Sequence, residues 1–210
     1  MTLREIEQIL RPFLGVNPIS QEQLGRTAAH LGLLLKWNAK INLTSIRSSE
    51  EIVARHFGES FFAARHFLSK DNQAGSAIDI GSGAGFPGLP MKIWSPSLAL
   101  TLIESNGRKA TFLREVCRAL ELSGIEVISK RADDVEARGD LVTMRAVERF
   151  ESVLPVAEKL MSSGGTLGLL IGAAQEKTAK EPLTDLEWQT RIPIPLSRSR
   201  VLLIGTKVRD

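Results

Sequence analysis

The sequence predicts an α/β protein with a doubly wound parallel sheet, a helical extension before the sheet and antiparallel strands at its C-terminal edge. Three observations predict this class. Helical periodicity fills the first 70 residues, strand-length apolar runs alternate with helix-length segments after them, and a glycine-rich loop follows the first of these runs. We therefore expect an N-terminal helical extension over residues 1–70 and a sheet domain over residues 71–210.

The helical extension is indicated by apolar side chains that recur every three or four residues. One stripe consists of Ile6, Ile9, Leu10 and Phe13, and a second of Leu24, Ala28, Leu31 and Leu35. Pro12 and Pro18 are expected to break this region. The run Ser48-Ser49-Glu50-Glu51 fits a capping box, so a further helix is predicted from about residue 49 to residue 67.

The sheet domain is indicated by a change of periodicity at residue 77. Short apolar runs alternate with helical ones over 77–80, 86–94, 99–104, 107–122, 125–130, 140–144, 149–161 and 166–171. This alternation is typical of a parallel sheet with helices on both faces. Two last runs, 188–194 and 200–205, are joined by so few residues that antiparallel pairing at the sheet edge is expected.

Composition fits a globular protein with one main domain. The chain has 210 residues, is 43% hydrophobic and carries a net charge of +3, which permits a nucleic-acid partner without requiring one. Charges interrupt the N-terminus where a signal peptide would be apolar, and no apolar run approaches the ~18 residues of a membrane span. We expect a cytoplasmic protein with no membrane partner, and a monomer by default.

The only cysteine, Cys117, limits the chemistry that is possible. A single cysteine excludes an internal disulfide and a multi-cysteine metal site, and no metal is expected. Cys117 lies at helical spacing with Ala110, Leu113 and Leu120, which favours a buried core thiol over a nucleophile.

The glycine-rich loop after the first predicted strand indicates a nucleotide-type cofactor. Gly81, Gly83 and Gly85 allow a sharp turn and a close approach of the backbone to a ligand, and the helix that follows would present free N–H groups. Asp79 precedes them, and the pattern acid-x-Gly-x-Gly-x-Gly resembles motif I of methyltransferases that use S-adenosylmethionine (SAM). A carboxylate attracts the sulfonium and ammonium groups of SAM, whereas it would repel a pyrophosphate. Gly83-Ala-Gly85-Phe-Pro-Gly88 also fits the dinucleotide pattern, so an NAD-dependent oxidoreductase remains an alternative.

Polar residues at the ends of the next predicted strands complete the expected cofactor site, because a doubly wound sheet binds its ligand at the carboxyl ends of its strands. Glu104 can accept hydrogen bonds from both ribose hydroxyls. Asp133 is placed to hold adenine, with Asp134 as the competing candidate. Arg145 ends the fourth strand and could hold a guanine O6, a phosphate or the cofactor carboxylate, or form a salt bridge with Glu148 or Glu104.

Two absences narrow the methyl acceptor. No Asn/Asp-Pro-Pro-aromatic tetrad follows the fourth predicted strand, which disfavours an exocyclic amine, and Cys117 is misplaced for addition to a pyrimidine ring. What remains is a nucleophile that already carries a lone pair, and guanine N7 is one such atom, because it bears no proton and needs no general base. The enzyme then has only to align nitrogen, methyl and sulfur.

Several motifs together resemble the RsmG family (glucose-inhibited division protein B), the bacterial 16S rRNA 7-methylguanosine methyltransferases. The resemblance covers roughly residues 24–172 and rests on Lys36-Trp-Asn-Ala-Lys-Ile-Asn-Leu-Thr44, Arg55-His56, Asp79-Ile-Gly-Ser-Gly-Ala-Gly-Phe-Pro-Gly-Leu-Pro90 and Arg145-Ala146. It implies a Rossmann-like class I SAM methyltransferase fold. It also implies that Gly81 and Phe86 contact SAM, that Ala132 and Asp133 bind adenine, and that Arg145 is catalytic and reaches the cofactor site.

The resemblance further implies a substrate, 16S rRNA, presented within the small ribosomal subunit or its precursor. Candidate phosphate contacts are then Lys36, Lys40, Arg47, Arg55, His56 and Arg65. Trp37 is either a core residue or a stacking surface for a base. Ile171 stands where the family usually ends its fifth strand with lysine, which favours an alternative, a non-catalytic SAM-binding ribosome-assembly factor.

Overall fold

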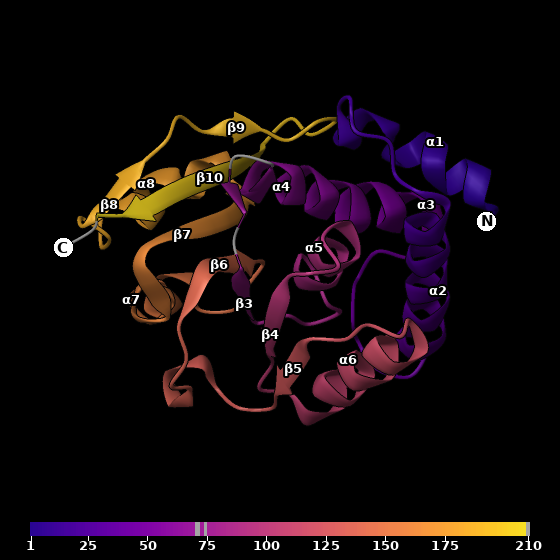
Figure 1. Ribbon diagram of the computed structural model, residues 1–210, viewed down its shortest axis with the longest axis horizontal. Helices are drawn as coiled ribbons and strands as arrows, with labels where there is room; N and C mark the ends of the chain where they lie inside the picture. Colours follow the sequence, from indigo (N-terminus) through magenta and orange to yellow (C-terminus); the bar gives the residue numbers. More distant parts are fainter. Residues whose placement is uncertain (70–71, 74, 209–210) are drawn as a thin grey trace.

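A mixed sheet of eight strands runs through the computed structural model, which describes residues 1–69, 72–73 and 75–208 (Figure 1). Its strands are β3 (Ser76–Ile80), β4 (Ala99–Ile103), β5 (Ile125–Ile128), β6 (Gly139–Arg145), β7 (Met161–Gly172), β8 (Leu186–Trp188), β9 (Ile192–Pro193) and β10 (Arg200–Lys207). The spatial order is β5-β4-β3-β6-β7-β10-β8, and β9 pairs with β10. A separate two-stranded ribbon joins β1 (Leu68–Ser69) to β2 (Asn72–Gln73).

The first five strands of this sheet are parallel, and their order reverses beside β3. β3 pairs with both β4 and β6, so the chain winds outward in two directions from this point. The predicted doubly wound sheet is therefore confirmed. A crevice is expected at the carboxyl ends of β3 and β6, where the winding direction changes.

The C-terminal strands run antiparallel to the rest, as predicted. β10 pairs antiparallel with β7 on one side and with β8 and β9 on the other. The predicted run 188–194 was wrong as a single strand, because β8 ends at Trp188 and β9 holds only two residues.

Helices cover both faces of the sheet. The helical elements are α1 (Leu3–Leu14), α2 (Gln21–Asn38), α3 (Ser49–Ile52), the π-helical segment η1 (Val53–Gly58), α4 (Glu59–Phe67), α5 (Gly88–Trp94), α6 (Gly107–Ala119), α7 (Phe150–Lys159), α8 (Glu176–Lys180) and the 3₁₀ turns η2 (Ala132–Asp134) and η3 (Ala173–Gln175). Figure 1 shows α1, α2 and α6 on the side of the molecule away from α7 and α8.

Side-chain alternation along the strands divides the core into two clusters. Ile78 and Ile80 of β3 point toward α7 and α8, whereas Ala77 points to the opposite side, where α1, α2, η1, α4, α5 and α6 pack. Gly168 of β7 allows Phe67 of α4 to lie directly on the sheet, since a Cβ at this glycine would meet the Phe67 ring. The N-terminal helices thus share one core cluster with the sheet.

The N-terminal helices follow the predicted pattern with two corrections. Capping boxes at Thr2 and Ser20 begin α1 and α2. The expected break at Pro12 was wrong: α1 continues through it to Leu14. Pro12 has no N–H to donate to the carbonyl one turn earlier, but buried Phe13 and Leu14 hold the last turn against the core. Leu35, expected in the buried stripe of α2, is exposed.

The helix predicted over residues 49–67 is present as three consecutive helical segments, α3, η1 and α4. Cys117 is partly buried against the first core cluster, and burial raises the pKa of its thiol to about 11, which disfavours a nucleophilic role. In the described ranges, no helix is both long enough and apolar enough to cross a membrane.

Candidate active site

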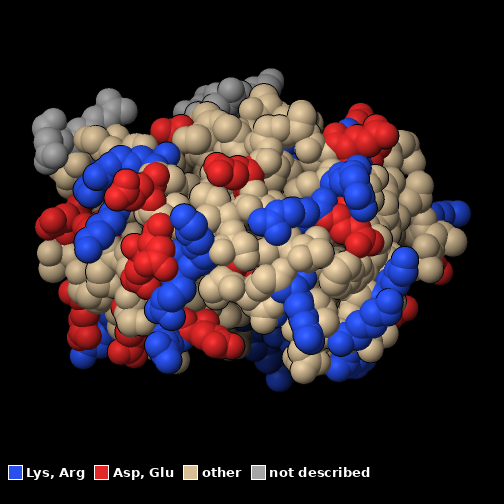
Figure 2. Space-filling view, turned by 90° about the horizontal axis from the view of Figure 1, so that it is seen from below, with Lys and Arg blue, Asp and Glu red and all other residues tan. Residues whose placement is uncertain are grey.

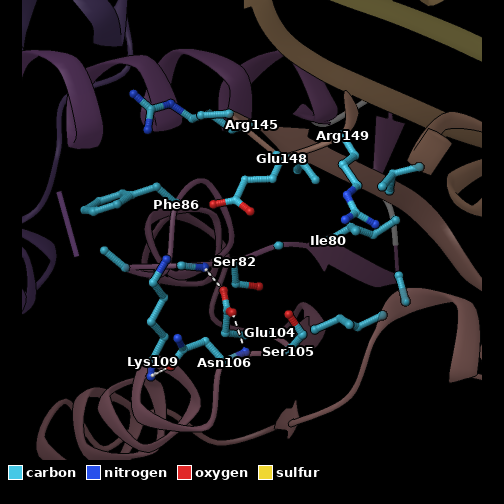
Figure 3. Close-up of a pocket in the computed structure, with 18 of the residues that line it drawn as sticks. Ile80, Ser82, Phe86, Glu104, Ser105, Asn106, Lys109, Arg145, Glu148 and Arg149 are labelled. Atoms are coloured by element: carbon cyan, nitrogen blue, oxygen red, sulfur yellow. Dashed lines mark hydrogen bonds between the residues drawn. The ribbon is translucent and has the colours of Figure 1, made fainter. Parts of the chain in front are cut away.

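A cavity of about 870 Å³ opens at the carboxyl ends of β3, β4 and β6, within the range of small-molecule sites (Figure 3). Nine of the predicted site residues line it: Gly81, Gly83, Phe86, Glu104, Ala132, Asp133, Arg145, Arg55 and His56. Six predicted residues do not line it: Asp79, Gly85, Lys36, Lys40, Arg47 and Arg65. The loop after β3 and the loop after β4 thus meet at one site, as the strand-end prediction required.

The glycine loop turns away from β3 through positive φ angles. Gly81 and Gly83 have φ of 66° and 56°, a conformation that favours glycine. Among the described residues, a Cβ at Gly83 would have one neighbour within 4 Å, the Gly81 carbonyl oxygen at 3.7 Å, so no side chain fills this part of the cavity lining. Gly85 also has a positive φ, but a Cβ there would meet Leu89 and Leu113, which places Gly85 against the core and not against the cavity.

Asp79 supports the loop from below and does not face the cavity. Its carboxylate is fully buried, accepts a hydrogen bond of 2.9 Å from the Thr143 hydroxyl and accepts another of 3.2 Å from the Gly88 amide. The first N–H of α5 therefore donates to Asp79 and is not free for a ligand. The expectation that this amide would contact a ligand was wrong. The expected attraction of SAM by this carboxylate is also corrected, because burial removes it from the cavity.

Burial of Asp79 makes folding stability depend on pH. Desolvation raises the pKa of this carboxyl from 3.8 to about 7, against the hydrogen bonds that lower it. Between these values the folded protein keeps a proton that the unfolded chain releases, so the contribution of Asp79 to stability falls as the pH rises through this window.

We expect Asp79→Asn to remove this pH dependence, since the amide oxygen can accept from Gly88 and the amide nitrogen can donate to Thr143. When the pH is raised from 5 to 8, the unfolding free energy of the variant relative to that of the unmodified protein should increase by about 2 to 3 kcal/mol. Urea unfolding of both proteins at the two pH values measures this difference. A stability difference that stays constant with pH would contradict the assignment.

Glu104 ties the loop after β4 to the glycine loop. One carboxylate oxygen accepts from the Gly83 amide at 2.9 Å and the other accepts from the Asn106 amide at 2.8 Å, as Figure 3 shows. Each oxygen retains a further lone pair. Glu104 can therefore hold the loop and still accept hydrogen bonds from two neighbouring hydroxyls.

The loop after β5 also lines the cavity. Ala132 and Asp133 belong to the turn η2 and line the cavity, whereas Asp134 does not. The Asp133 carboxylate accepts from Arg131 at 3.2 Å and is half exposed, so it remains accessible to a ligand.

Arg145 lies in a buried ion cluster at the end of β6. Its Nη2 donates to Glu59 Oε2 at 3.2 Å and to the Arg55 carbonyl at 3.0 Å. Arg200 Nε donates to the same Glu59 oxygen at 3.0 Å, so two guanidinium groups share one carboxylate. The salt-bridge partner of Arg145 is thus Glu59, not Glu148 or Glu104 as the alternative had it. Arg145 Nε is buried and has no hydrogen-bond partner within the described chain.

Charge around the cavity is predominantly positive. Seven cationic side chains line it, namely Arg55, Lys109, Lys130, Arg131, Arg145, Arg149 and Arg200, against the three carboxylates of Glu104, Asp133 and Glu148. Figure 2 shows Lys and Arg interspersed with Asp and Glu over the face of the molecule that is seen from below. An anionic ligand or an anionic polymer at the cavity mouth is favoured by this distribution.

The comparisons with known proteins agree with this geometry. Residues 23–194 match the family model of rRNA small subunit methyltransferase G. The chain belongs to this family. Two relatives named ribosomal RNA small subunit methyltransferase G are from Roseiflexus sp. (strain RS-1), 44% identical over 207 residues with 90% of this chain and 86% of the relative covered, and from Xylella fastidiosa (strain M23), 39% identical over 184 residues with 85% and 84% covered.

The fold of this methyltransferase G family member is shared with other methyltransferases. The crystal structure of the N-methyltransferase NodS from Bradyrhizobium japonicum WM9 in complex with S-adenosyl-L-homocysteine matches with a TM-score of 0.62 at 14% identity, covering 85% of this chain and 98% of that one. The predicted Rossmann-like class I methyltransferase fold is therefore confirmed.

One family motif explains a loop that sequence reasoning did not interpret. Asn38 Oδ1 accepts from the amides of Leu43 and Thr44, and its Nδ2 donates to the Thr44 carbonyl at 3.0 Å. This side chain clamps the segment that carries Thr44 at the cavity wall. Asn38, the first asparagine of the Trp-Asn-x-x-x-Asn-Leu-Thr motif, was the signal that could have predicted this loop contact.

The predicted RNA contacts on the N-terminal helices are divided by the structure. Arg55 is exposed at the cavity mouth, but His56 is buried, and burial lowers the pKa of its imidazole to about 3, which removes it as a cationic phosphate contact. Arg65 lies over the Phe62 ring at 4.8 Å. Trp37 packs edge-on against Phe112 at 5.7 Å in the first core cluster, which favours the core interpretation.

Proposed function

We propose that this protein is a SAM-dependent methyltransferase that transfers a methyl group to N7 of a guanine in the RNA of the small ribosomal subunit. The observation that carries the proposal is the hydrogen bond between the glycine loop and Glu104, which lies where the strand order of the sheet reverses. The chain that forms this site belongs to the methyltransferase G family. The named relatives act on small-subunit rRNA, and the NodS structure holds S-adenosyl-L-homocysteine.

The residues that line the cavity fit SAM in two respects. Gly83 leaves a space that any Cβ would enter, and Glu104 offers free lone pairs beside that space for the ribose hydroxyls. Ala132, Asp133 and Phe86 also line the cavity, and in this proposal Ala132 and Asp133 bind the adenine. SAM, when bound, supplies an electrophilic methyl group.

Arg145 has the properties of a residue that holds the acceptor base. Its Nη2 is anchored by Glu59 and by a backbone carbonyl, while its buried Nε is a donor with no partner in the described chain. We propose that this guanidinium binds the guanine O6 or an adjacent phosphate and so orients N7. No base is required, because N7 carries no proton.

The two parts of the chain have different roles in this proposal. Residues 71–210 form the SAM methyltransferase domain, and residues 1–70 form a helical extension that contributes to RNA binding. The proposed phosphate contacts are Arg55 at the cavity mouth and Lys36, Lys40 and Arg47 farther from it. The 16S rRNA would be presented within the small subunit or its precursor.

Methyl transfer from labelled SAM to small ribosomal subunits that lack the modification tests the proposal. Label is expected on guanine N7 of the 16S rRNA, and label only on another atom would contradict the assignment. Binding of SAM and of subunits without any transfer would favour the assembly-factor alternative, in which buried Ile171 takes the place of the lysine usual in the family. Calorimetry with NAD in place of SAM tests the oxidoreductase alternative.

A further inference from the structure

Phe86 of the glycine loop lies between two histidine rings from the N-terminal helical region. The His30 imidazole stacks on it with centroids 5.1 Å apart and an interplanar angle of 11°, and His56 stacks with centroids 5.0 Å apart at 29°. Phe57 meets the same ring edge-on at 4.9 Å. The side chain of Phe86 is therefore held by residues of α2 and η1, outside the sheet.

His30 also holds the main chain of the loop. Its Nε2 donates to the Ala84 carbonyl at 3.0 Å, and within the described residues no other group donates to this oxygen. Because Ala84 is buried, an unsatisfied carbonyl there would be costly. One imidazole thus contacts the loop at a backbone atom and at a side chain two residues apart.

The position of His30 indicates a neutral ring with a fixed tautomer. The side chain is fully buried, and burial lowers the pKa of the imidazole to about 4. Donation to a carbonyl requires the proton on Nε2, which leaves Nδ1 as a buried nitrogen with no hydrogen-bond partner among the described residues. Because burying this polar ring is costly, we attribute its presence to the hydrogen bond that it donates to the loop.

We propose that His30 is a positioning residue for SAM binding, which acts through Ala84 and Phe86 to hold the glycine loop in the shape that leaves the cavity open. The inference rests on the proposed function and deepens it. It makes the N-terminal helical region part of the cofactor site, so residues 71–210 alone do not complete that site.

Two substitutions separate the two contacts of His30. His30→Leu removes both the ring and the donor, whereas His30→Phe keeps a ring for Phe86 and removes only the donor. Ile6→Ala is the matched control, because Ile6 is fully buried in the same core cluster but lies on α1, which packs on α2, α4 and η1. It lowers stability without touching the loop.

SAM affinity by calorimetry and steady-state kinetics give the first test. We expect His30→Leu to raise the Kd and KM for SAM about tenfold, His30→Phe to raise them less, and kcat at saturating SAM to stay within about threefold of the unmodified protein. Ile6→Ala should leave the Kd unchanged. A Kd for His30→Leu within about twofold of the unmodified protein, or an equal loss in Ile6→Ala, would overturn the proposal. Should the leucine variant not fold, the phenylalanine variant carries the same test.

Amide hydrogen exchange without SAM keeps this inference separate from the proposed function. The amides of Gly85 and Phe86 donate to the Ser82 carbonyl and report loop order. We expect them to exchange about tenfold faster in His30→Leu than in Ile6→Ala. Equal exchange in the two variants would overturn the positioning role. If the unmodified protein bound no SAM, the proposed function would fail while the exchange result would still decide the role of His30.

Discussion

Gly83→Asp is expected to abolish SAM binding, with at least about a 100-fold rise in Kd, or about 2.7 kcal/mol. The new side chain would enter the cavity that Gly83 lines, since a Cβ there meets only the Gly81 carbonyl oxygen, at 3.7 Å, among the described residues. It would also bring a second carboxylate next to Glu104, which already binds the Gly83 amide at 2.9 Å. Two like charges about 4 Å apart at a protein surface repel by about 4 kcal/mol, so the loop would also be distorted.

Calorimetric titration with SAM measures this loss. Gly32→Asp is a suitable control, because Gly32 lies on the exposed side of α2 with open space around it and outside the cavity lining. It should bind SAM with the affinity of the unmodified protein. Near-normal affinity in Gly83→Asp would show that the loop does not contact the cofactor.

Arg145→Ala is expected to lower kcat/KM for methyl transfer by about 100-fold or more while the protein stays folded. Removal of one hydrogen-bond donor from a preorganised site typically has an effect of this size. The fold should tolerate the change, because Arg200 Nε still neutralises Glu59 at 3.0 Å after Arg145 is removed. The substitution therefore leaves Glu59 paired with one of its two cations. The loss of unfolding free energy should stay below the about 3 to 5 kcal/mol that is typical when a buried charge loses its only partner.

Single-turnover methylation and thermal unfolding of the same variant separate the two effects. Arg138→Ala serves as the control: Arg138 also donates to a backbone carbonyl, that of Met161, but does not line the cavity. It should retain full turnover. A loss of stability in Arg145→Ala with unchanged turnover per folded molecule would indicate a structural salt bridge instead.

The parts of the site that could be predicted from sequence are those carried by local patterns. The glycine loop and Glu104 each follow a strand directly, and parallel strands bring their carboxyl ends to one edge of the sheet, so periodicity alone places them together. Arg145 follows from the same rule. The absence of an Asn/Asp-Pro-Pro-aromatic tetrad favoured guanine N7 as the acceptor atom, and the family resemblance added the RNA, which no spacing indicates.

Contacts between distant segments could not be predicted in this way. Glu59, Arg145 and Arg200 come from α4, β6 and β10, and only the folded sheet brings their charges together. His30 is separated from Ala84 by 54 positions, and nothing in the helical periodicity of α2 marks it as different from a core residue. Asp79 was misplaced for a related reason: alternation along β3 gives the side of the sheet, but the close approach of Gly88 determines that the carboxylate faces a helix and not the cavity.

A crystal structure of the protein with SAM tests the central claim most directly. We predict both ribose hydroxyls within hydrogen-bonding distance of the Glu104 carboxylate, with the cofactor backbone lying over Gly83 and the adenine beside Asp133. A cavity that stays empty at saturating SAM, or a cofactor whose ribose lies away from Glu104, would contradict the account.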